Sequence, residues 1–169
     1  MTQELLELRQ YINEGRYQDA LEIIDELEEM SKKAILEKIQ SFLVRLLIHL
    51  IKNQVEQRLT NSWAVSIWDS IIKIQYLNLK DNKKSYYIKE EDWHDYLEEA
   101  FDDAIFAASV EVFEGTYNPF QLREKVNEED VKNIANDFLK MTYNYSKKII
   151  RQEINHNLSQ LPGGESWFN

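Results

Sequence analysis

Apolar side chains recur three and four positions apart along most of the chain, which is the spacing of one face of an α-helix. Leu5, Leu8 and Ile12 form one such stripe within residues 2–14. Gly15 follows, at a position where a helix can end in the left-handed conformation. A second helix is expected to begin near Tyr17, with Ala20, Ile24 and Leu27 facing inward. The N-terminal residues are therefore predicted to form a helical hairpin.

The most apolar stretch lies in a predicted third helix over residues 32–57. Between Phe42 and Ile51 its apolar side chains cover nearly the whole circumference, so other helices must surround it. A further helix is expected to begin at Trp63, and another to cover residues 92–112. A last long helix is expected to be capped by Asn127 and to carry Val131, Ile134, Phe138, Tyr145 and Ile149. No segment shows sustained alternation of period two, so no sheet is expected. The predicted fold is all-α, an antiparallel bundle of about five to six helices around the central apolar helix. We expect one domain over residues 1–160 and a C-terminal tail over residues 161–169, which should dock because it ends in Trp167 and Phe168.

Composition narrows the class of protein. The chain has 169 residues, of which 43% are hydrophobic and 30% charged, and it contains no cysteine. Disulfides, thiolate zinc sites and cysteine nucleophiles are thereby excluded. The first seven residues lack the basic and apolar regions of a secretory signal, and the apolar run of residues 42–51 is too short to span a bilayer. We expect a cytoplasmic protein that does not enter the membrane.

The net charge of −10 is unevenly distributed along the chain. Residues 1–30 hold nine acids and two bases, residues 31–89 hold four acids and eleven bases, and residues 90–114 hold ten acids and no base. The overall negative field disfavours nucleic acid as a partner. The basic segment is expected to lie between its two acidic neighbours, or else to offer a local phosphate-binding face.

The central part of the chain resembles a bacterial family that is abundant in cyanobacteria and known as domain of unknown function twenty-nine. The likeness covers about residues 4–126. The residues that carry it include Met30-Ser31-Lys32-Lys33, His49-Leu50-Ile51-Lys52, Asn61-Ser62-Trp63, Leu97-Glu98-Glu99-Ala100-Phe101 and Tyr117-Asn118-Pro119. The resemblance implies an all-helical fold and supplies no activity.

One polar stripe crosses the apolar helix. Arg45, His49, Lys52 and Glu56 are spaced four, three and four apart and so share one helix face, with Arg58 and Trp63 shortly beyond them. The stripe, called the polar seam below, is either a buried network neutralised by acids from the acidic segments or a site for an anion or a partner. In the second interpretation His49 would titrate near neutral pH.

Two Glu-x-x-His pairs raise the question of a metal. Glu91 with His94, and Glu153 with His156, have the spacing found in carboxylate-bridged di-iron bundles. One pair lies in the first turn of its predicted helix and the other near the end of the last helix, whereas a di-iron site belongs in the middle of a bundle. We therefore expect neither pair to bind metal, and no cofactor is predicted.

Arg151 and His156 also fit the Arg-x(4–6)-His pattern of the HEPN ribonucleases, in which the Arg holds a phosphate and the His acts as an acid or base. The chain shows no phosphate-binding glycine loop and no nucleophile elbow. The favoured function is a non-enzymatic protein-interaction or assembly module, with a protein partner or a second copy of the chain as its ligand. The alternative is a HEPN-like ribonuclease or a metal-dependent enzyme that uses the last helix.

Overall fold

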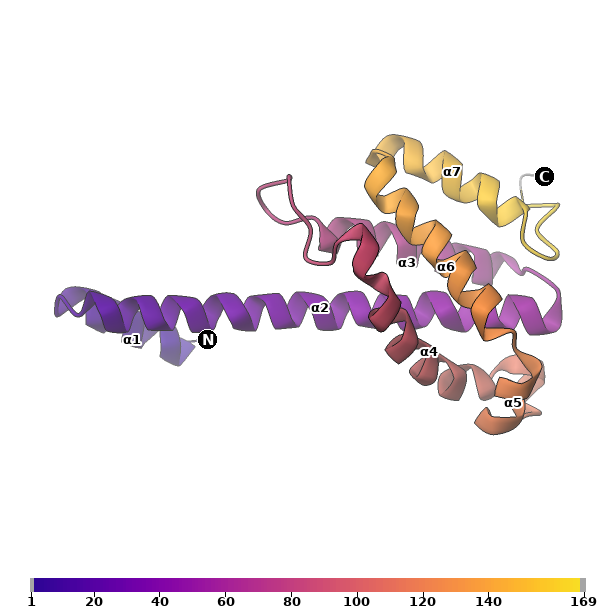
Figure 1. Ribbon diagram of the computed structural model, residues 1–169, viewed down its shortest axis with the longest axis horizontal. Coiled ribbons are helices and arrows are strands. Elements are labelled where there is room, and N and C mark those ends of the chain that lie inside the picture. Colours follow the sequence, from indigo (N-terminus) through magenta and orange to yellow (C-terminus); the bar gives the residue numbers. More distant parts are fainter. Residues whose placement is uncertain (1, 168–169) are drawn as a thin grey trace. The chain divides into compact units, whose positions relative to one another are not determined.

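The computed structural model describes residues 2–167, and this part of the chain is all-helical, with no strand. The elements, in order, are α1 (Thr2–Asn13), α2 (Tyr17–Glu56), α3 (Asn61–Asn78), η1 (Glu90–Asp92), α4 (Trp93–Ser109), η2 (Val112–Gly115), α5 (Pro119–Lys125), α6 (Glu128–Asn144) and α7 (Lys147–Ser159). Figure 1 shows their succession along the chain. The all-α prediction is confirmed. No helix among the described residues is both long enough and apolar enough to cross a membrane.

Two of the predicted helix boundaries are wrong. The second and third predicted helices are one continuous helix, α2, because the polar run Ser31-Lys32-Lys33 contains neither glycine nor proline and can stay helical. The predicted last helix is instead two, since the side chain of Ser146 caps a new helix, accepting a hydrogen bond from the N–H of Ile149. The short helix α5, which starts at Pro119 behind an Asn118–Gln121 capping box, was not expected.

By its contacts the chain divides into two compact units, residues 1–38 and residues 39–169. The single domain over residues 1–160 stays a prediction. In the first unit, α1 lies alongside the beginning of α2 (Figure 1). Gly15 joins the two helices with φ of +72°, as expected for a left-handed helix end. Ala20 and Ile23 are buried, Ile24 and Leu27 are half-buried, and Leu5 and Ile12 are exposed.

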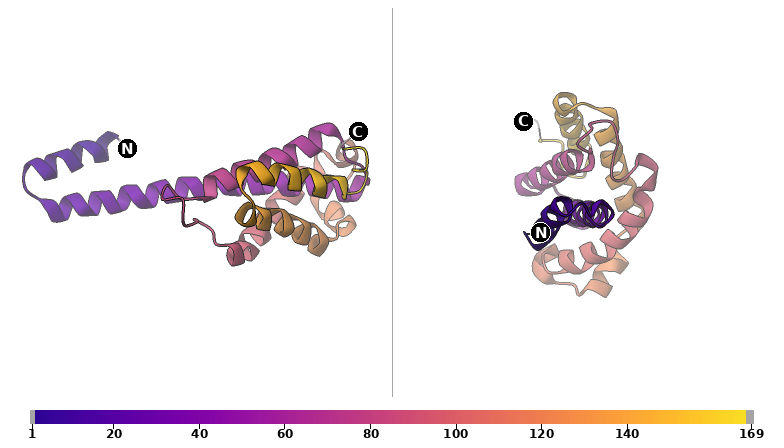
Figure 2. Two further views of the ribbon diagram at one scale, coloured as in Figure 1. Left: turned by 90° about the horizontal axis from the view of Figure 1, so that it is seen from above. Right: turned by 90° about the vertical axis from the view of Figure 1, so that its left-hand side faces the viewer.

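The second unit contains the main apolar core. From residue 39 onward, α2 contributes Ile39, Leu43, Leu46, Leu47, Leu50 and Ile51, which are all buried. The other helices contribute to the core mainly through Ile67, Ile71, Ile74, Phe101, Ile105, Leu139, Ile150 and Ile154. Helix α3 packs against α6 and α7, and α4 packs against α5 and α6. Figure 2 shows α3 and α7 side by side in two views.

A buried hydrogen-bond network holds the loop between α3 and α4. The Asn78 side chain donates to the carbonyl of Ile88 and accepts from its N–H, at 2.9 and 2.7 Å. The Tyr143 hydroxyl accepts from Trp93 Nε1 at 2.7 Å and donates to the same Ile88 carbonyl at 2.6 Å. Burial raises the pKa of Tyr143 to about 12, so the hydroxyl keeps its proton and its role as a donor.

The start of the C-terminal tail lies against its own unit. The Pro162 carbonyl accepts a hydrogen bond from Asn53 Nδ2 at 2.9 Å, and Trp167 Nε1 donates to Asn155 Oδ1 at 3.0 Å. Gly164 is buried. Phe168, the other ring in the tail prediction, lies outside the described residues.

Candidate functional site

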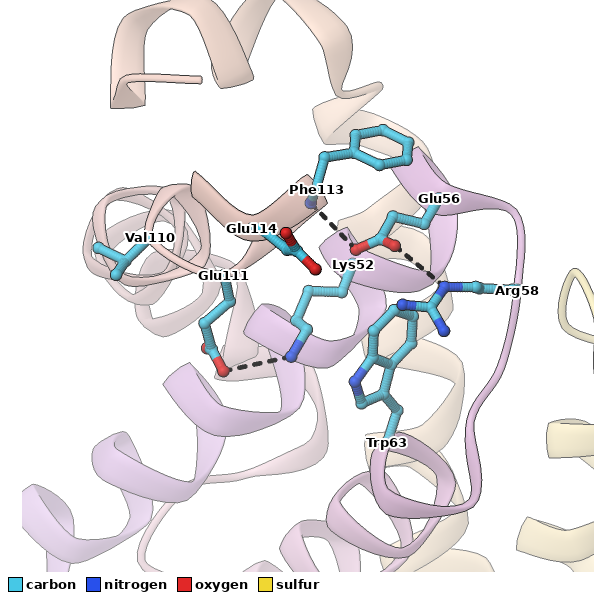
Figure 3. Close-up of a pocket in the computed structure, with 8 residues that line it drawn as sticks. All are labelled: Lys52, Glu56, Arg58, Trp63, Val110, Glu111, Phe113 and Glu114. Atoms are coloured by element: carbon cyan, nitrogen blue, oxygen red, sulfur yellow. Dashed lines mark hydrogen bonds and ion pairs between the residues drawn. The ribbon is translucent and has the colours of Figure 1, made fainter. Parts of the chain in front are cut away.

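The second unit has a pocket of about 620 Å³ at the corner where α2 ends and α4 passes into η2. It is lined by Lys52, Glu56, Arg58, Trp63, Val110, Glu111, Phe113 and Glu114. Figure 3 shows these residues on three segments: the end of α2 with the loop after it, the start of α3, and the α4–η2 corner. We call this the corner pocket.

Two cations flank the indole ring of Trp63. The Lys52 ammonium lies 4.7 Å from the ring centroid, and the Arg58 guanidinium carbon lies 4.6 Å from it. Trp63 is held in place because Thr60 caps α3, its hydroxyl accepting from the Trp63 N–H at 3.1 Å. The ring covers the stem of Lys52, whose side chain is only 7% exposed, while its charge is balanced by Glu111 at 3.2 Å. This pairing accounts for a lysine so deeply buried.

Glu56 links the end of α2 to the α4–η2 corner. Its side chain is 6% exposed, and one carboxylate oxygen accepts from Arg58 Nε at 3.0 Å. The other oxygen accepts from the backbone N–H of Phe113 at 3.3 Å. A buried carboxylate needs such partners, and here they tie two distant segments together (Figure 3).

The backbone at the pocket mouth is strained. Phe113 and Glu114 both adopt left-handed conformations, with φ of 44° and 57°, which side chains with a Cβ seldom adopt. Each such residue costs about 1–3 kcal/mol unless its surroundings hold it there. The hydrogen bond that the Phe113 N–H donates to Glu56 is one such restraint. Val110 and Phe113, at the rim of the pocket, are 74% and 46% exposed.

The polar seam of the sequence is divided by the fold. Lys52, Glu56, Arg58 and Trp63 line the corner pocket, whereas Arg45 binds Asp69 of α3 at 2.8 Å. His49 lies between these two groups on α2, and its Nδ1 atom is buried without a hydrogen-bond partner among the described residues. Burial, together with the nearby positive charges of Lys52 and Arg45, lowers the pKa of His49 to about 4, although the negative charge of Glu111 opposes the shift.

The low pKa of His49 gives a testable pH dependence. An unfolded chain takes up a proton on this imidazole near the ordinary pKa of about 6.5, whereas the folded protein does so only near pH 4. The His49 contribution to stability is therefore complete above the unfolded pKa and falls as the pH is lowered from the ordinary value toward 4. Urea unfolding of wild type and His49→Gln across this window should show a steeper loss for wild type. Parallel profiles would contradict the assignment.

Four lining residues of the corner pocket were missed by the sequence analysis: Val110, Glu111, Phe113 and Glu114. The available signal was the ten acids without a base in residues 90–114, one of the acidic segments expected to neutralise the polar seam in its network interpretation, and Glu111 pairs with Lys52. Nothing in the helical periodicity indicated that the chain turns back on itself after residue 109. Only that turn brings Glu111 to Lys52.

The first Glu-x-x-His pair lines a smaller pocket. Glu91 and His94 lie with Glu98, Glu129 and Lys132 around a cavity of about 220 Å³. Lys132 binds Glu98 at 2.5 Å, and this hydrogen bond lowers the pKa of the glutamate. Across residues 2–167, no group of three or more His, Asp or Glu side chains is arranged to hold a metal ion.

The candidate residues of α7 lie away from both pockets. Arg151 places its guanidinium carbon 5.6 Å from the Trp68 ring centroid, and His156 is exposed near the end of the helix. Five positions along an α-helix turn about 140° about its axis, so the two side chains leave different sides of α7. The HEPN-like ribonuclease stays an alternative interpretation, and the expectation that Glu153 and His156 bind no metal stays a prediction.

The fold and the corner pocket define a small all-helical protein whose candidate site carries paired charges around a tryptophan. The model of the family described as "Domain of unknown function DUF29" matches residues 3–115, and the chain belongs to this family. The resemblance noted in the sequence is thus confirmed. Every lining residue of the corner pocket falls inside the matched range, whereas Arg151 and His156 fall outside it. No curated protein and no solved structure matches the chain.

Proposed function

We propose that the protein is a non-enzymatic interaction module whose corner pocket binds a basic side chain of a protein partner, next to apolar partner residues. The observation that carries this proposal is the strained α4–η2 corner, where Val110 and Phe113 are exposed beside the ion pairs of Lys52 with Glu111 and of Arg58 with Glu56. Strained backbone persists where surrounding contacts enforce it, and such sites are enriched at binding surfaces.

The apolar part of the binding surface extends beyond the pocket mouth. Phe106 and Phe120 are 55% and 72% exposed, and their ring centroids lie 6.1 Å apart. Together with Val110 and Phe113 they supply exposed apolar groups from α4, η2 and α5. Contiguous exposed apolar groups of this kind mark protein-interaction sites, which supports a partner segment with apolar side chains.

The charges in the pocket favour a basic partner residue. Lys52 and Arg58 are already balanced by Glu111 and Glu56. Glu114 also lines the pocket, and its carboxylate makes no ion pair within residues 2–167. The residue that completes the balance of charge is a Lys or Arg from the partner.

The scaffold for this site is proposed to be an antiparallel bundle around the second half of α2. This arrangement is supported by the complete burial of Ile39, Leu43, Leu46, Leu47 and Ile51 on that helix. A rigid scaffold holds the end of α2 against the α4–η2 corner, so that a partner meets a preorganised surface.

A peptide selection tests the proposal. Random peptides displayed on phage and selected on the full chain should be enriched in sequences with Lys or Arg beside Leu, Ile or Phe. A synthetic peptide of the enriched sequence should bind Val110→Asp and Glu114→Lys at least about tenfold more weakly than wild type, a difference of about 1.4 kcal/mol.

Asp137→Lys is the matched control for Glu114→Lys, because Asp137 is an exposed acid on α6 outside the corner pocket, and binding should be unchanged. Mass spectrometry of the recovered peptide should show no change in mass, as expected for binding without catalysis. Enrichment of acidic peptides, or equal affinity for Val110→Asp and wild type, would reject the proposal.

A further inference from the structure

The first unit is both acidic and apolar on its surface. Residues 1–30 carry nine acids and two bases, and we call them the acidic hairpin. Leu5, Leu6, Ile12 and Leu21 of this segment are each about half exposed. Leu5 and Ile12 are seven positions apart and therefore share one face of α1. The surface of the acidic hairpin thus combines exposed leucine and isoleucine side chains with a strong negative charge.

A surface of the opposite charge lies on the second unit. On α3, Val65, Trp68, Ile72 and Tyr76 follow one another at helical spacing, and Val65 and Tyr76 are exposed. Helix α7, beside it, places Lys147 Nζ 5.4 Å from the Tyr76 ring centroid and Arg151 Cζ 5.6 Å from that of Trp68. We call these six residues the α3–α7 face.

The surroundings of the α3–α7 face are also basic. Residues 61–89 and 147–159, which form α3, the loop after it and α7, hold eight Lys and Arg against three acids. Asp69, the one acid of α3, is already bound to Arg45 and lies near Lys73. Cations stacked on aromatic rings stay available to a carboxylate at the ring edge, so this face suits an acidic, apolar helix.

We propose that the acidic hairpin of one copy of this chain docks on the α3–α7 face of a second copy. The two surfaces are complementary in charge, and both expose apolar side chains. Their lengths agree as well, since α1, with 12 residues, is about 18 Å long, and the stripe from Val65 to Tyr76 spans about 17 Å. Reciprocal docking gives a closed dimer, and one-way docking gives a longer series of copies. This proposal is independent of the corner pocket.

Light scattering of the full chain tests for self-association. The mass should exceed 20.2 kDa at low ionic strength and fall toward that value in high salt. The reason is that the screening length shortens from about 10 Å at 0.1 M to about 3 Å at 1 M salt. A monomer at every concentration and salt would overturn the proposal and leave these surfaces to a different protein or to nucleic acid.

Charge reversal identifies the two surfaces. The double variant Asp25→Lys with Glu28→Lys reverses exposed acids on the side of the hairpin that bears Leu21. The double variant Lys147→Glu with Arg151→Glu reverses the α3–α7 face. Each should weaken self-association at least about tenfold, because like charges then oppose each other across the contact. An equimolar mixture of the two variants should associate again, since the reversed hairpin now matches the reversed face.

The control for the hairpin variant is Glu124→Lys with Asp137→Lys, which makes the same change in charge at exposed positions of α5 and α6. It should associate as wild type does. Circular dichroism melts verify that every variant is folded. Wild-type association by either surface variant, or no recovery in the mixture, would show that another surface joins the copies and would overturn the proposal.

Discussion

Replacement of Leu47 by alanine is expected to lower the free energy of unfolding by about 2–5 kcal/mol, the range for deletion of a buried leucine side chain. Leu47 is 0% exposed and lies in the most apolar part of α2. The change removes apolar surface from the core and leaves a cavity that the neighbouring helices fill only in part. Urea or guanidinium unfolding followed by circular dichroism gives the measurement.

Leu6→Ala is the matched control, because it is the same substitution at a leucine that is 58% exposed. Its effect should stay within about 0.5 kcal/mol. If Leu47→Ala leaves the unfolding midpoint where it is in wild type, the assignment of the second half of α2 to the core is wrong.

Replacement of Gly164 by alanine is expected to destabilise the protein by about 1–3 kcal/mol, the usual cost of forcing extra atoms into a packed region. A Cβ at this position would lie 2.2 Å from the backbone oxygen of Leu158 and 3.0 Å from that of Leu161. Both contacts are with backbone, so the tail has to move away from the end of α7. A thermal melt, read by circular dichroism, measures the loss.

Ser166→Ala serves as the comparison, because it introduces the same residue at an exposed position two residues further along the tail. Its melting temperature should be close to that of wild type, because ordinary surface substitutions change the free energy of unfolding by no more than about 0.5 kcal/mol. Equal melting temperatures for Gly164→Ala and Ser166→Ala would mean that the tail contributes nothing to the stability of the second unit.

The local elements were the most predictable part of the structure. Helical spacing of Leu5, Leu8 and Ile12, followed by Gly15, predicted α1 and its left-handed end. The cap at Asn127 was also predicted, and its side chain accepts from the N–H of Asp130. These features depend on a few neighbouring residues, so they can be derived without knowing the tertiary contacts.

Helix ends that depend on weak local preferences were less predictable. The helix expected from Trp63 begins at Asn61 instead and is capped by Thr60, although Asn61 and Ser62 are also residue types that can cap a helix. The boundary predicted between two helices at Ser31-Lys32-Lys33 contains no glycine or proline. Helix α2 continues through it because polar residues disfavour a helix only slightly. Such small differences are decided by the packing of the residues on either side.

By itself the sequence determined the helical class, the family, the buried stretch between Phe42 and Ile51 and half of the corner pocket. Lys52, Glu56, Arg58 and Trp63 are close together in the chain, so helical spacing and a short loop are enough to group them. The tertiary structure alone decided that Arg45 leaves this group for Asp69 and that Glu111 and Phe113 join it. The physical reason is distance along the chain: Lys52 and Glu111 are 59 positions apart, and they meet only because α4 packs so that its end lies beside the end of α2. The chain then turns at Phe113 and Glu114, where the Phe113 N–H donates to Glu56. A left-handed turn of two residues with side chains has no local sequence signal, because it is held by contacts such as that between Glu56 and the Phe113 N–H.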